Sequence, residues 1–212
     1  ITLLGRIPSP KILVEAMKVV RPTVVCAVPM ILEKVYRKMI LPLLEKKPMS
    51  IAMRIPLINT AIYSTIRTKL MEEFGGCIEI FVVGGAALNK ETEDFLRLIK
   101  FPITVGYGMT ECAPLISFEL PQYFKSGSCG RILPKELLEG KILSRDPENI
   151  PGELLVHGEH VMMGYYKNPE ETARVLKGGW FHTGDLGFID ERGYLSITGR
   201  CKNLIVLDNG KN

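Results

Sequence analysis

The chain has 212 residues, enough to form one large domain or two small ones around a hydrophobic core. Hydrophobic residues make up 46% and charged residues 24%, a balance that excludes an intrinsically disordered chain. The net charge of +4 is mild and forms no dense Lys/Arg stripe, which argues against a nucleic-acid-binding protein, and no apolar stretch reaches the roughly 18 residues that a membrane-spanning helix needs.

Helices and strands alternate in the first half of the chain. Ser9-Pro10 is typical of a helix start, and Arg21-Pro22 and Gly75-Gly76 are typical of helix ends. The expected elements are, in order, a helix from Pro10 to about Val20, a strand at 23–28, a helix from Pro29 to about Lys46, a helix ending at Gly75, a strand at 78–83, a helix from Asn89 to Lys100 and a strand at 102–105. This alternation predicts an α/β fold with a mostly parallel sheet covered by helices. Ligands of such sheets gather beyond the carboxyl ends of the strands, so chemistry is expected at the loops 84–86 and 106–108.

Beyond about Phe118 the pattern changes to short β-like runs broken by Gly, Pro and Asp. The expected strands cover residues 141–143, 152–157, 187–189 and 194–198, and the turn 190–193 fits a hairpin. One helix interrupts them, with Asn168 as N-cap and Pro169 at its first position, and runs to Lys177. This half is predicted to form a small antiparallel β-barrel or a distorted sheet.

A glycine-rich motif follows the strand expected at 102–105. Its residues are Gly106, Tyr107, Gly108, Met109, Thr110 and Glu111. The glycines let the backbone approach a ligand closely, and Tyr107 can stack on a flat ring such as adenine. Thr110 can donate a hydrogen bond to a phosphate oxygen, and Glu111 can hold Mg²⁺, which favours oxygen ligands. The structural alternative is a tight turn with a solvated glutamate.

Two further candidate stretches lie near the end of the chain. Residues 179–187 contain the single tryptophan, two glycines that pin a turn, and Asp185, whose carboxylate can accept two ribose hydroxyls. The alternative is an aspartate in a barrel turn, where this residue is favoured. His182 is interpreted as structural rather than catalytic. In 199–203, Arg200 offers a rigid fork of donors to hydroxyl or phosphate oxygens, although alone it would be a surface ion-pair residue.

Taken together, these motifs resemble the ordered core motifs of the adenylate-forming enzymes, the group that holds acyl-CoA synthetases, beetle luciferases and the adenylation domains of peptide synthetases. The matching segments are 84–88, 107–111, 152–154 with 164–165, 180–187 and 199–203, and the resemblance spans about residues 22–212. The ending Arg200-Cys201-Lys202-Asn203-Leu204-Ile205, followed by residues 208–212, looks most like the long-chain fatty-acid branch.

The resemblance implies roles for the residues around the nucleotide base and phosphates. Gly85 and Ala86 would line the adenine pocket, and Tyr107 would stack on the base. Thr110 would bind phosphate and Glu111 would ligate Mg²⁺, so these two are the expected catalytic residues. Gly106, Gly108 and Met109 would complete the nucleotide-binding loop.

The resemblance also implies roles for the second half of the chain. Asp185 would take both ribose hydroxyls, with Ile197 packing nearby and Arg200 assisting. Lys202 would be the hinge about which a C-terminal domain rotates. Val105 is a departure, because many members carry there a polar residue that reaches the adenine amino group, and this one contact is therefore in doubt.

Two pieces of the family's site are absent from this sequence. They are the Ser/Thr/Gly-rich loop with Lys that cradles the β and γ phosphates, and the C-terminal domain with the Lys that neutralises the reacting groups. The chain also begins with Ile1 rather than Met, so it is expected to be an internal piece of a longer enzyme. The expected division is an α/β subdomain at 1–118, a β-barrel-like subdomain at 119–199, and the hinge with the start of a C-terminal domain at 200–212.

The resemblance implies a ligase that joins a fatty acid to coenzyme A through an acyl-adenylate, using ATP and Mg²⁺. Two alternatives remain open: a synthetase for another acid (aryl, short-chain or carrier-protein-loading), and a non-catalytic fragment with residual nucleotide binding. The five cysteines are scattered and lack C-x-x-C spacing, which indicates a reducing, cytoplasmic setting without a disulfide framework or a zinc site. Peripheral membrane contact and oligomeric state are left open by the sequence.

Overall fold

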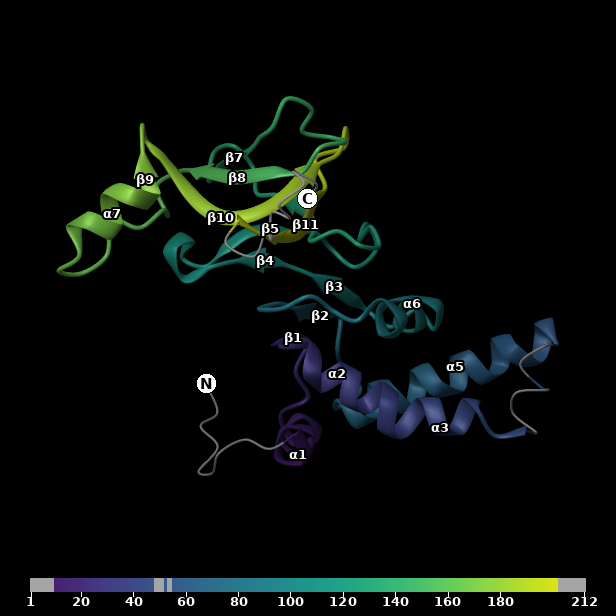
Figure 1. The fold of residues 1–212 in the computed structure, drawn as a ribbon. Coiled ribbons are helices and arrows are strands. Elements are labelled where there is room, and N and C mark those ends of the chain that lie inside the picture. Colours follow the sequence, from purple (N-terminus) through teal and green to yellow (C-terminus); the bar gives the residue numbers. More distant parts are fainter. Residues whose placement is uncertain (1–9, 48–51, 53–54, 202–212) are drawn as a thin grey trace, which may run out of the picture. The chain divides into compact units, whose positions relative to one another are not determined.

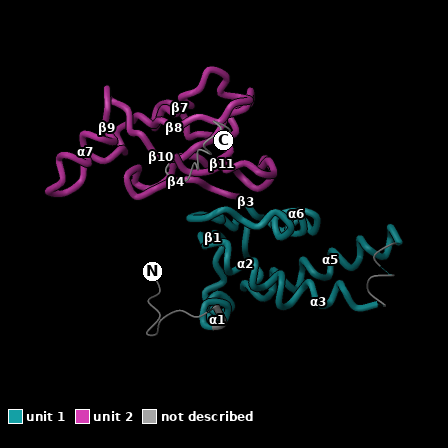
Figure 2. Tube along the Cα trace, in the orientation of Figure 1, with its two compact units in different colours: residues 1–104 teal, residues 105–212 magenta. Residues whose placement is uncertain are grey.

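A computed structural model describes residues 10–47, 52 and 55–201 of the chain (Figure 1). The chain folds as two compact units, residues 1–104 and 105–212, which Figure 2 distinguishes by colour. The predicted division at 118 and 199 stays a prediction. None of the described helices is both long and apolar enough to cross a membrane.

The first unit is a three-stranded sheet with helices, as the alternating pattern predicted. In chain order it contains α1 (Pro10–Val20), β1 (Val24–Ala27), α2 (Pro29–Val35), the π-helical η1 (Tyr36–Ile40), α3 (Leu41–Leu44), α5 (Pro56–Glu73), β2 (Ile80–Val83), α6 (Lys90–Leu98) and β3 (Ile103–Val105). The strand order is β1-β2-β3, and β1 pairs with β2 in parallel. The α/β part of the predicted fold is therefore confirmed.

Local sequence signals explain where these helices begin and end. The side chain of Asn89 accepts a hydrogen bond from the Thr92 N–H and caps α6, as expected. Gly75 and Gly76 both adopt positive φ after α5, and the Gly76 N–H closes the helix on the Met71 carbonyl at 2.7 Å. Ser9, the predicted cap of α1, lies outside the described residues.

The helix predicted from Pro29 forms, but with a π-helical turn in it. The Leu41 N–H donates to the Tyr36 carbonyl, five residues back, and Pro42 follows directly. Proline has no N–H to continue the α-helical bonding pattern, which accounts for the irregularity at this point.

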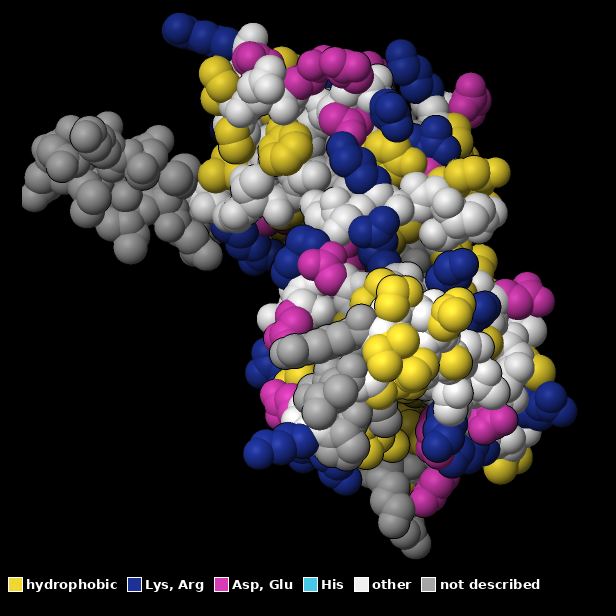
Figure 3. Space-filling model, turned by 90° about the vertical axis from the view of Figure 1, so that its right-hand side faces the viewer, with side chains coloured by type: hydrophobic (Ala, Val, Ile, Leu, Met, Phe, Trp, Pro, Cys, Tyr) yellow, Lys and Arg dark blue, Asp and Glu magenta, His cyan; other side chains and the backbone are white. Residues whose placement is uncertain are grey.

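Aromatic side chains form the centre of the first unit. Phe74, Phe81 and Phe101 are buried, with ring centroids 5.4 to 6.0 Å apart. Other apolar side chains of this unit stay exposed, among them Leu43, Leu57 and Ile58. Figure 3 shows hydrophobic side chains on the face where α3 ends and α5 begins.

The described part of the second unit, residues 105–201, consists of two antiparallel sheets, one α-helix and one 3₁₀ helix. Its elements are β4 (Tyr107–Gly108), the 3₁₀-helical η2 (Thr110–Cys112), β5 (Leu115–Phe118), β6 (Arg131–Ile132), β7 (Glu139–Leu143), β8 (Gly152–His157), α7 (Pro169–Val175), β9 (Leu176–Lys177), β10 (Trp180–Ile189) and β11 (Leu195–Arg200). The larger sheet has the order β11-β10-β8-β7 with β9 paired to β10, and the smaller sheet has the order β4-β5-β6. The curled antiparallel part of the predicted fold is thus confirmed as well.

The two sheets of this unit enclose a common core. Its buried residues are Cys112, Ile116, Leu138, Ile142, Leu154, Val156, Phe181 and Leu195. Backbone hydrogen bonds join the sheets directly, from the Cys129 N–H to the Leu195 carbonyl at 2.7 Å and from the Leu195 N–H to the Gly130 carbonyl at 2.9 Å. The strand ends that carry the predicted site residues are therefore held by one hydrophobic centre.

One prediction in this unit was wrong. The glycines around Asp185 were taken to pin a turn, with a strand only from Gly187, but Trp180–Ile189 is a single ten-residue strand. It is held by β8 on one side and β11 on the other, and a register irregularity between His182 and Leu186 accommodates the turn-forming residues. Asp185 consequently stands in the middle of a strand, with 4% of its surface exposed.

Candidate functional site

The glycine-rich motif forms β4 and the turn into η2. Gly108 lies so close to the segment after η2 that a Cβ on it would stand 2.0 Å from the Pro114 carbonyl oxygen. The same oxygen accepts a hydrogen bond from the Met109 N–H at 2.7 Å. Only glycine fits this approach, and the turn places Glu111 at a fixed position in η2.

We expect Gly108→Ala to lower the free energy of unfolding by about 1–3 kcal/mol, because the new methyl group forces the turn off the Pro114 carbonyl. Gly199→Ala is the matched control, since a Cβ there meets no atom within 4 Å. Urea denaturation of the two variants measures the difference. Equal stability of both would mean that the turn adapts without strain.

Asp185 is the buried centre of a polar cluster in the second unit. Its Oδ2 accepts a hydrogen bond from the Tyr107 hydroxyl at 2.6 Å, and its Oδ1 forms an ion pair with the Arg200 Nε at 3.0 Å. Arg200 stands directly opposite Asp185 in the pairing of β10 with β11. The Asp185 side chain is 6% exposed, whereas that of Arg200 is 71% exposed. Both carboxylate oxygens are thus oriented, one by a phenol and one by a guanidinium group.

The Tyr107 hydroxyl is a donor in this cluster. Burial and then the hydrogen bond to Asp185 raise the pKa of Tyr107 well above its ordinary value. The phenol therefore stays protonated and keeps donating to the carboxylate across the physiological pH range. The Tyr107 ring packs against the core of the second unit.

Glu111 is held in a similar way by a tyrosine from a different segment. The Tyr165 hydroxyl donates to the Glu111 Oε1 at 2.9 Å, and burial together with this bond raises the pKa of Tyr165 to about 12. The Tyr165 N–H is in turn fixed by the Thr172 Oγ1 at 2.9 Å. Backbone contact between the segments comes from the Met162 N–H, which donates to the Glu111 carbonyl at 2.8 Å. Glu111 is one of the residues that line the pocket described next.

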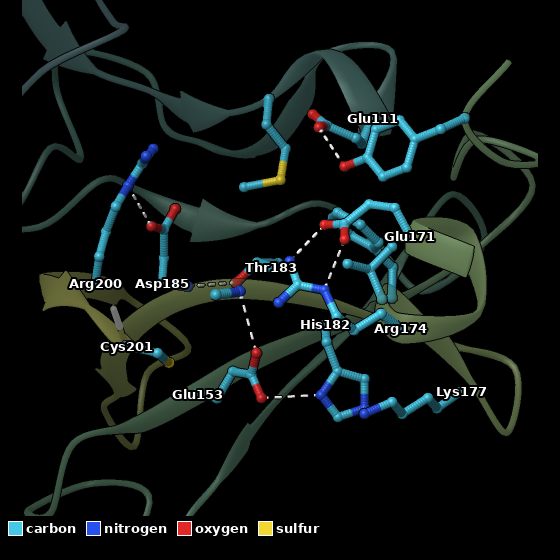
Figure 4. Close-up of a pocket in the computed structure, with 15 residues that line it drawn as sticks. Glu111, Glu153, Glu171, Arg174, Lys177, His182, Thr183, Asp185, Arg200 and Cys201 are labelled. Carbon is cyan, nitrogen blue, oxygen red and sulfur yellow. Dashed lines mark hydrogen bonds and ion pairs between the residues drawn. The ribbon is translucent and has the colours of Figure 1, made fainter. Parts of the chain in front are cut away.

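Asp185 and Glu111 line one pocket, with a volume of about 460 Å³ (Figure 4). In this view Arg200 and Asp185 lie together at one end, and Glu111, Glu171 and Arg174 lie toward the other. The further lining residues are Met109, Glu153, Tyr165, Val175, Lys177, Phe181, His182, Thr183, Gly184 and Cys201. The wall carries both carboxylates and cationic groups, a combination suited to a ligand with hydroxyl, phosphate and metal-bound parts.

The structure brings some predicted site residues together and leaves others apart. Met109, Glu111, Asp185 and Arg200 line the pocket, and Tyr107 reaches it through Asp185. The remaining predicted residues stand as follows: Gly106 is buried before β4, Thr110 is exposed beside Glu111, Ile197 is partly buried opposite Gly187, Gly85 and Ala86 follow β2 in the first unit, and Lys202 lies outside the described residues.

Several pocket residues had no functional role assigned from the sequence. Glu153 accepts the Gly184 N–H on Oε1 at 3.1 Å and lies 2.9 Å from the His182 Nδ1 through Oε2. His182 was interpreted as structural, yet it lines the pocket. The available signals were a carboxylate inside the strand at 152–157 and the Gly164-Tyr165 pair, whose partners only the fold reveals.

Comparison with known proteins identifies the family of the chain. The family model for the AMP-binding enzymes matches residues 2–166. The 4-coumarate–CoA ligase 1 of Solanum tuberosum is 37% identical over 191 residues, which is 83% of this chain and 34% of that protein. The long chain acyl-CoA synthetase 1 of Arabidopsis thaliana is 41% identical over 152 residues, 68% of this chain and 23% of that protein. The chain therefore spans about a third or less of the length of these curated relatives.

A solved structure shares the fold. The O-succinylbenzoate coenzyme A synthetase of Bacillus subtilis, in complex with ATP and a magnesium ion, superposes with a TM-score of 0.69 at 23% identity, covering 95% of this chain and 36% of that one. The resemblance seen in the sequence motifs is confirmed, and the chain belongs to the AMP-binding enzyme family.

Proposed function

We propose that the chain is the nucleotide-binding part of an ATP-dependent acyl-CoA synthetase, which activates a carboxylic acid as its acyl-adenylate and then transfers it to coenzyme A. The observation that carries this proposal is the oriented Asp185 carboxylate in the same pocket as Glu111. The family match and the CoA ligases among the relatives support it.

Asp185 is suited to hold the two ribose hydroxyls of the nucleotide. A carboxylate offers about four acceptor positions, and Tyr107 and Arg200 take two of them. The other two can accept one hydroxyl each. Because the donors on either side fix the carboxylate before a ligand arrives, little orientational freedom is lost on binding.

Glu111 is suited to hold Mg²⁺ together with the nucleotide. Its Oε1 is occupied by Tyr165, which leaves Oε2 as a hard oxygen ligand. Within residues 10–47, 52 and 55–201 there is no group of three or more His, Cys, Asp or Glu side chains that could hold a metal. Mg²⁺ commonly takes one or two carboxylates and fills its shell with water and substrate phosphates. A bound Mg²⁺ would neutralise phosphate charge, and Thr110 would donate a hydrogen bond to a phosphate oxygen beside it.

The proposed reaction has two steps. The acid carboxylate attacks the α-phosphorus of ATP and pyrophosphate leaves, and the thiol of coenzyme A then displaces AMP from the acyl-adenylate. Neither step requires a covalent nucleophile of the protein, so the pocket residues act by binding and orienting the reactants. Gly85, Ala86 and the Tyr107 ring would hold adenine, Ile197 would pack near the ribose, and Lys202 would be the hinge between the two steps. We also propose that the protein is located in the cytoplasm.

For the acid, we propose a long-chain fatty acid, on the basis of the residues 200–212 and the 41% identity to a long chain acyl-CoA synthetase. An aryl acid is the second candidate, because the 4-coumarate ligase matches over more of the chain. Acid-dependent exchange of pyrophosphate into ATP by the full-length protein tests the function. With hexadecanoate, 4-coumarate and acetate as the panel, we expect the largest exchange with hexadecanoate. If exchange occurs with 4-coumarate alone, the substrate is an aryl acid. If it occurs with none of the three acids, the proposal that the protein is a synthetase for these acid classes is rejected.

A further inference from the structure

The segment that carries Asp185 is an irregular part of β10. In the pairing with β8, His182 stands opposite Leu155 and Leu186 opposite Glu153. Three residues of β10, namely Thr183, Gly184 and Asp185, therefore face the single residue Leu154. Backbone groups in such a bulge lose their regular partners in the ladder, and the side chains that replace those partners decide where the bulge points.

Two side chains supply the missing partners. The Glu153 Oε1 accepts the N–H of Gly184 at 3.1 Å, and Gly184 adopts φ of +73°, which glycine tolerates. Thr183 bridges the bulge with one hydroxyl: it donates to the Leu154 carbonyl at 2.8 Å and accepts the Asp185 N–H at 3.1 Å. The two backbone N–H groups that precede the Asp185 Cα are thus held by hydrogen bonds, that of Gly184 by Glu153 of β8 and that of Asp185 by the Thr183 hydroxyl, which itself bonds to β8.

Glu153 is itself held in place. Its Oε2 lies 2.9 Å from the His182 Nδ1, and the two side chains are 22% and 23% exposed. Figure 4 shows the Glu153 carboxylate below the strand, with one dashed line to the β10 backbone and one to the His182 ring. One carboxylate therefore contacts both the side chain of His182, the last paired residue before the bulge, and the N–H of Gly184 at the centre of the bulge.

We infer that Glu153 is a positioning residue for ribose recognition, acting through the Gly184 N–H on the direction of the Asp185 carboxylate. This inference rests on the proposed role of Asp185 toward the ribose. The bulge aims Asp185 at the donors Tyr107 and Arg200, and without Glu153 the Gly184 N–H has no acceptor in the strand pairing. The carboxylate would then sample other directions, and the ribose hydroxyls would lose their acceptor.

The test compares AMP with 2′,3′-dideoxy-AMP as ligands of the full-length protein, by calorimetry or fluorescence. For Glu153→Ala we expect about tenfold weaker binding of AMP, the effect of about one hydrogen bond, and binding of the dideoxy analogue unchanged within about twofold. Glu153→Gln keeps an acceptor for Gly184 and is expected to restore AMP affinity to within about threefold. Glu153→Met keeps the length of the side chain without the acceptor, so it carries the test if the alanine variant does not fold.

The control is Glu171→Ala, which removes another carboxylate from the same pocket, one paired with Arg174 within α7. In this variant only a charge is removed, so the affinities for AMP and for dideoxy-AMP should change by the same factor. An equal loss for both ligands in the Glu153 variants, or no loss for AMP, would overturn the positioning role. If Asp185→Ala itself leaves AMP binding unchanged, the proposed ribose site fails, and that result is distinct from a failure of Glu153 alone.

Discussion

Asp185→Ala in the full-length protein is expected to weaken the binding of both ATP and AMP about a hundredfold. Two hydrogen bonds from ribose hydroxyls to a charged acceptor are lost, and at about 1.5 kcal/mol each they amount to roughly 3 kcal/mol. The loss is large because the carboxylate is fixed in advance by Tyr107 and Arg200. The dissociation constants of ATP and AMP, measured by calorimetry, give the result.

Stability has to be separated from recognition in this experiment. Alanine at 185 leaves the buried Tyr107 hydroxyl without its acceptor, so Asp185→Asn, which keeps the shape and one acceptor oxygen, is measured beside it. Asp146→Ala removes a carboxylate from a turn outside the pocket, where it bonds Asn149, and should leave nucleotide affinity unchanged. If the folded Asp185→Ala protein binds ATP and AMP with wild-type affinity, Asp185 has a structural role in the sheet and does not bind the nucleotide.

Much of the fold could be predicted because its signals are local. Asn89 caps α6, Asn168 accepts the Glu171 N–H and caps α7, and Gly75 ends α5 with a positive φ. Each of these signals acts within about four residues of the chain, so neither the sheet nor the core is needed to interpret it. The parallel pairing of β1 with β2 then follows from the alternation of strands and helices.

The strand β10 was mispredicted because tertiary pairing overrides local preference there. Gly184, Asp185 and Gly187 all favour turns, and the sequence alone gives no reason to extend them. In the fold, β8 and β11 flank the segment, and the side chain of Glu153 accepts the N–H that the bulge leaves over. Such acceptors come from residues some thirty positions away, beyond the reach of pattern analysis.

The candidate site shows the same division. Asp185 and Arg200 were identified from their motifs, and the antiparallel pairing of β10 with β11 places them opposite each other. The bond from Tyr107 to Asp185 joins residues 78 positions apart, and the bond from Tyr165 to Glu111 joins residues 54 positions apart. Chemistry predicts that each carboxylate needs a donor, but only the tertiary fold identifies which tyrosine supplies it.

Glu111→Gln is expected to reduce the first half-reaction by about a hundredfold or more while leaving the affinity for AMP within about twofold. The proposed partner of Glu111 is Mg²⁺ with the departing phosphates, and AMP lacks those phosphates. The amide keeps an oxygen for the Tyr165 hydroxyl, so the turn at η2 retains its contact and the change falls on the charge alone. Pyrophosphate exchange and AMP binding are measured on the same preparation.

A titration with Mg²⁺ separates a metal ligand from a structural glutamate. If Glu111 ligates the metal, the concentration of Mg²⁺ that gives half-maximal exchange rises in Glu111→Gln. Tyr165→Phe removes only the donor to Glu111 Oε1. We expect a smaller rise in the half-maximal Mg²⁺ concentration in this variant, and a loss of exchange rate of about tenfold or less. The backbone bond from the residue-165 N–H to the Thr172 Oγ1 remains in this variant, so any loss there reports the orientation of the carboxylate and not its charge. If pyrophosphate exchange is unchanged at every Mg²⁺ concentration, Glu111 has only a structural role in the turn. If AMP binding is lost together with exchange, the substitution disturbs the pocket as a whole.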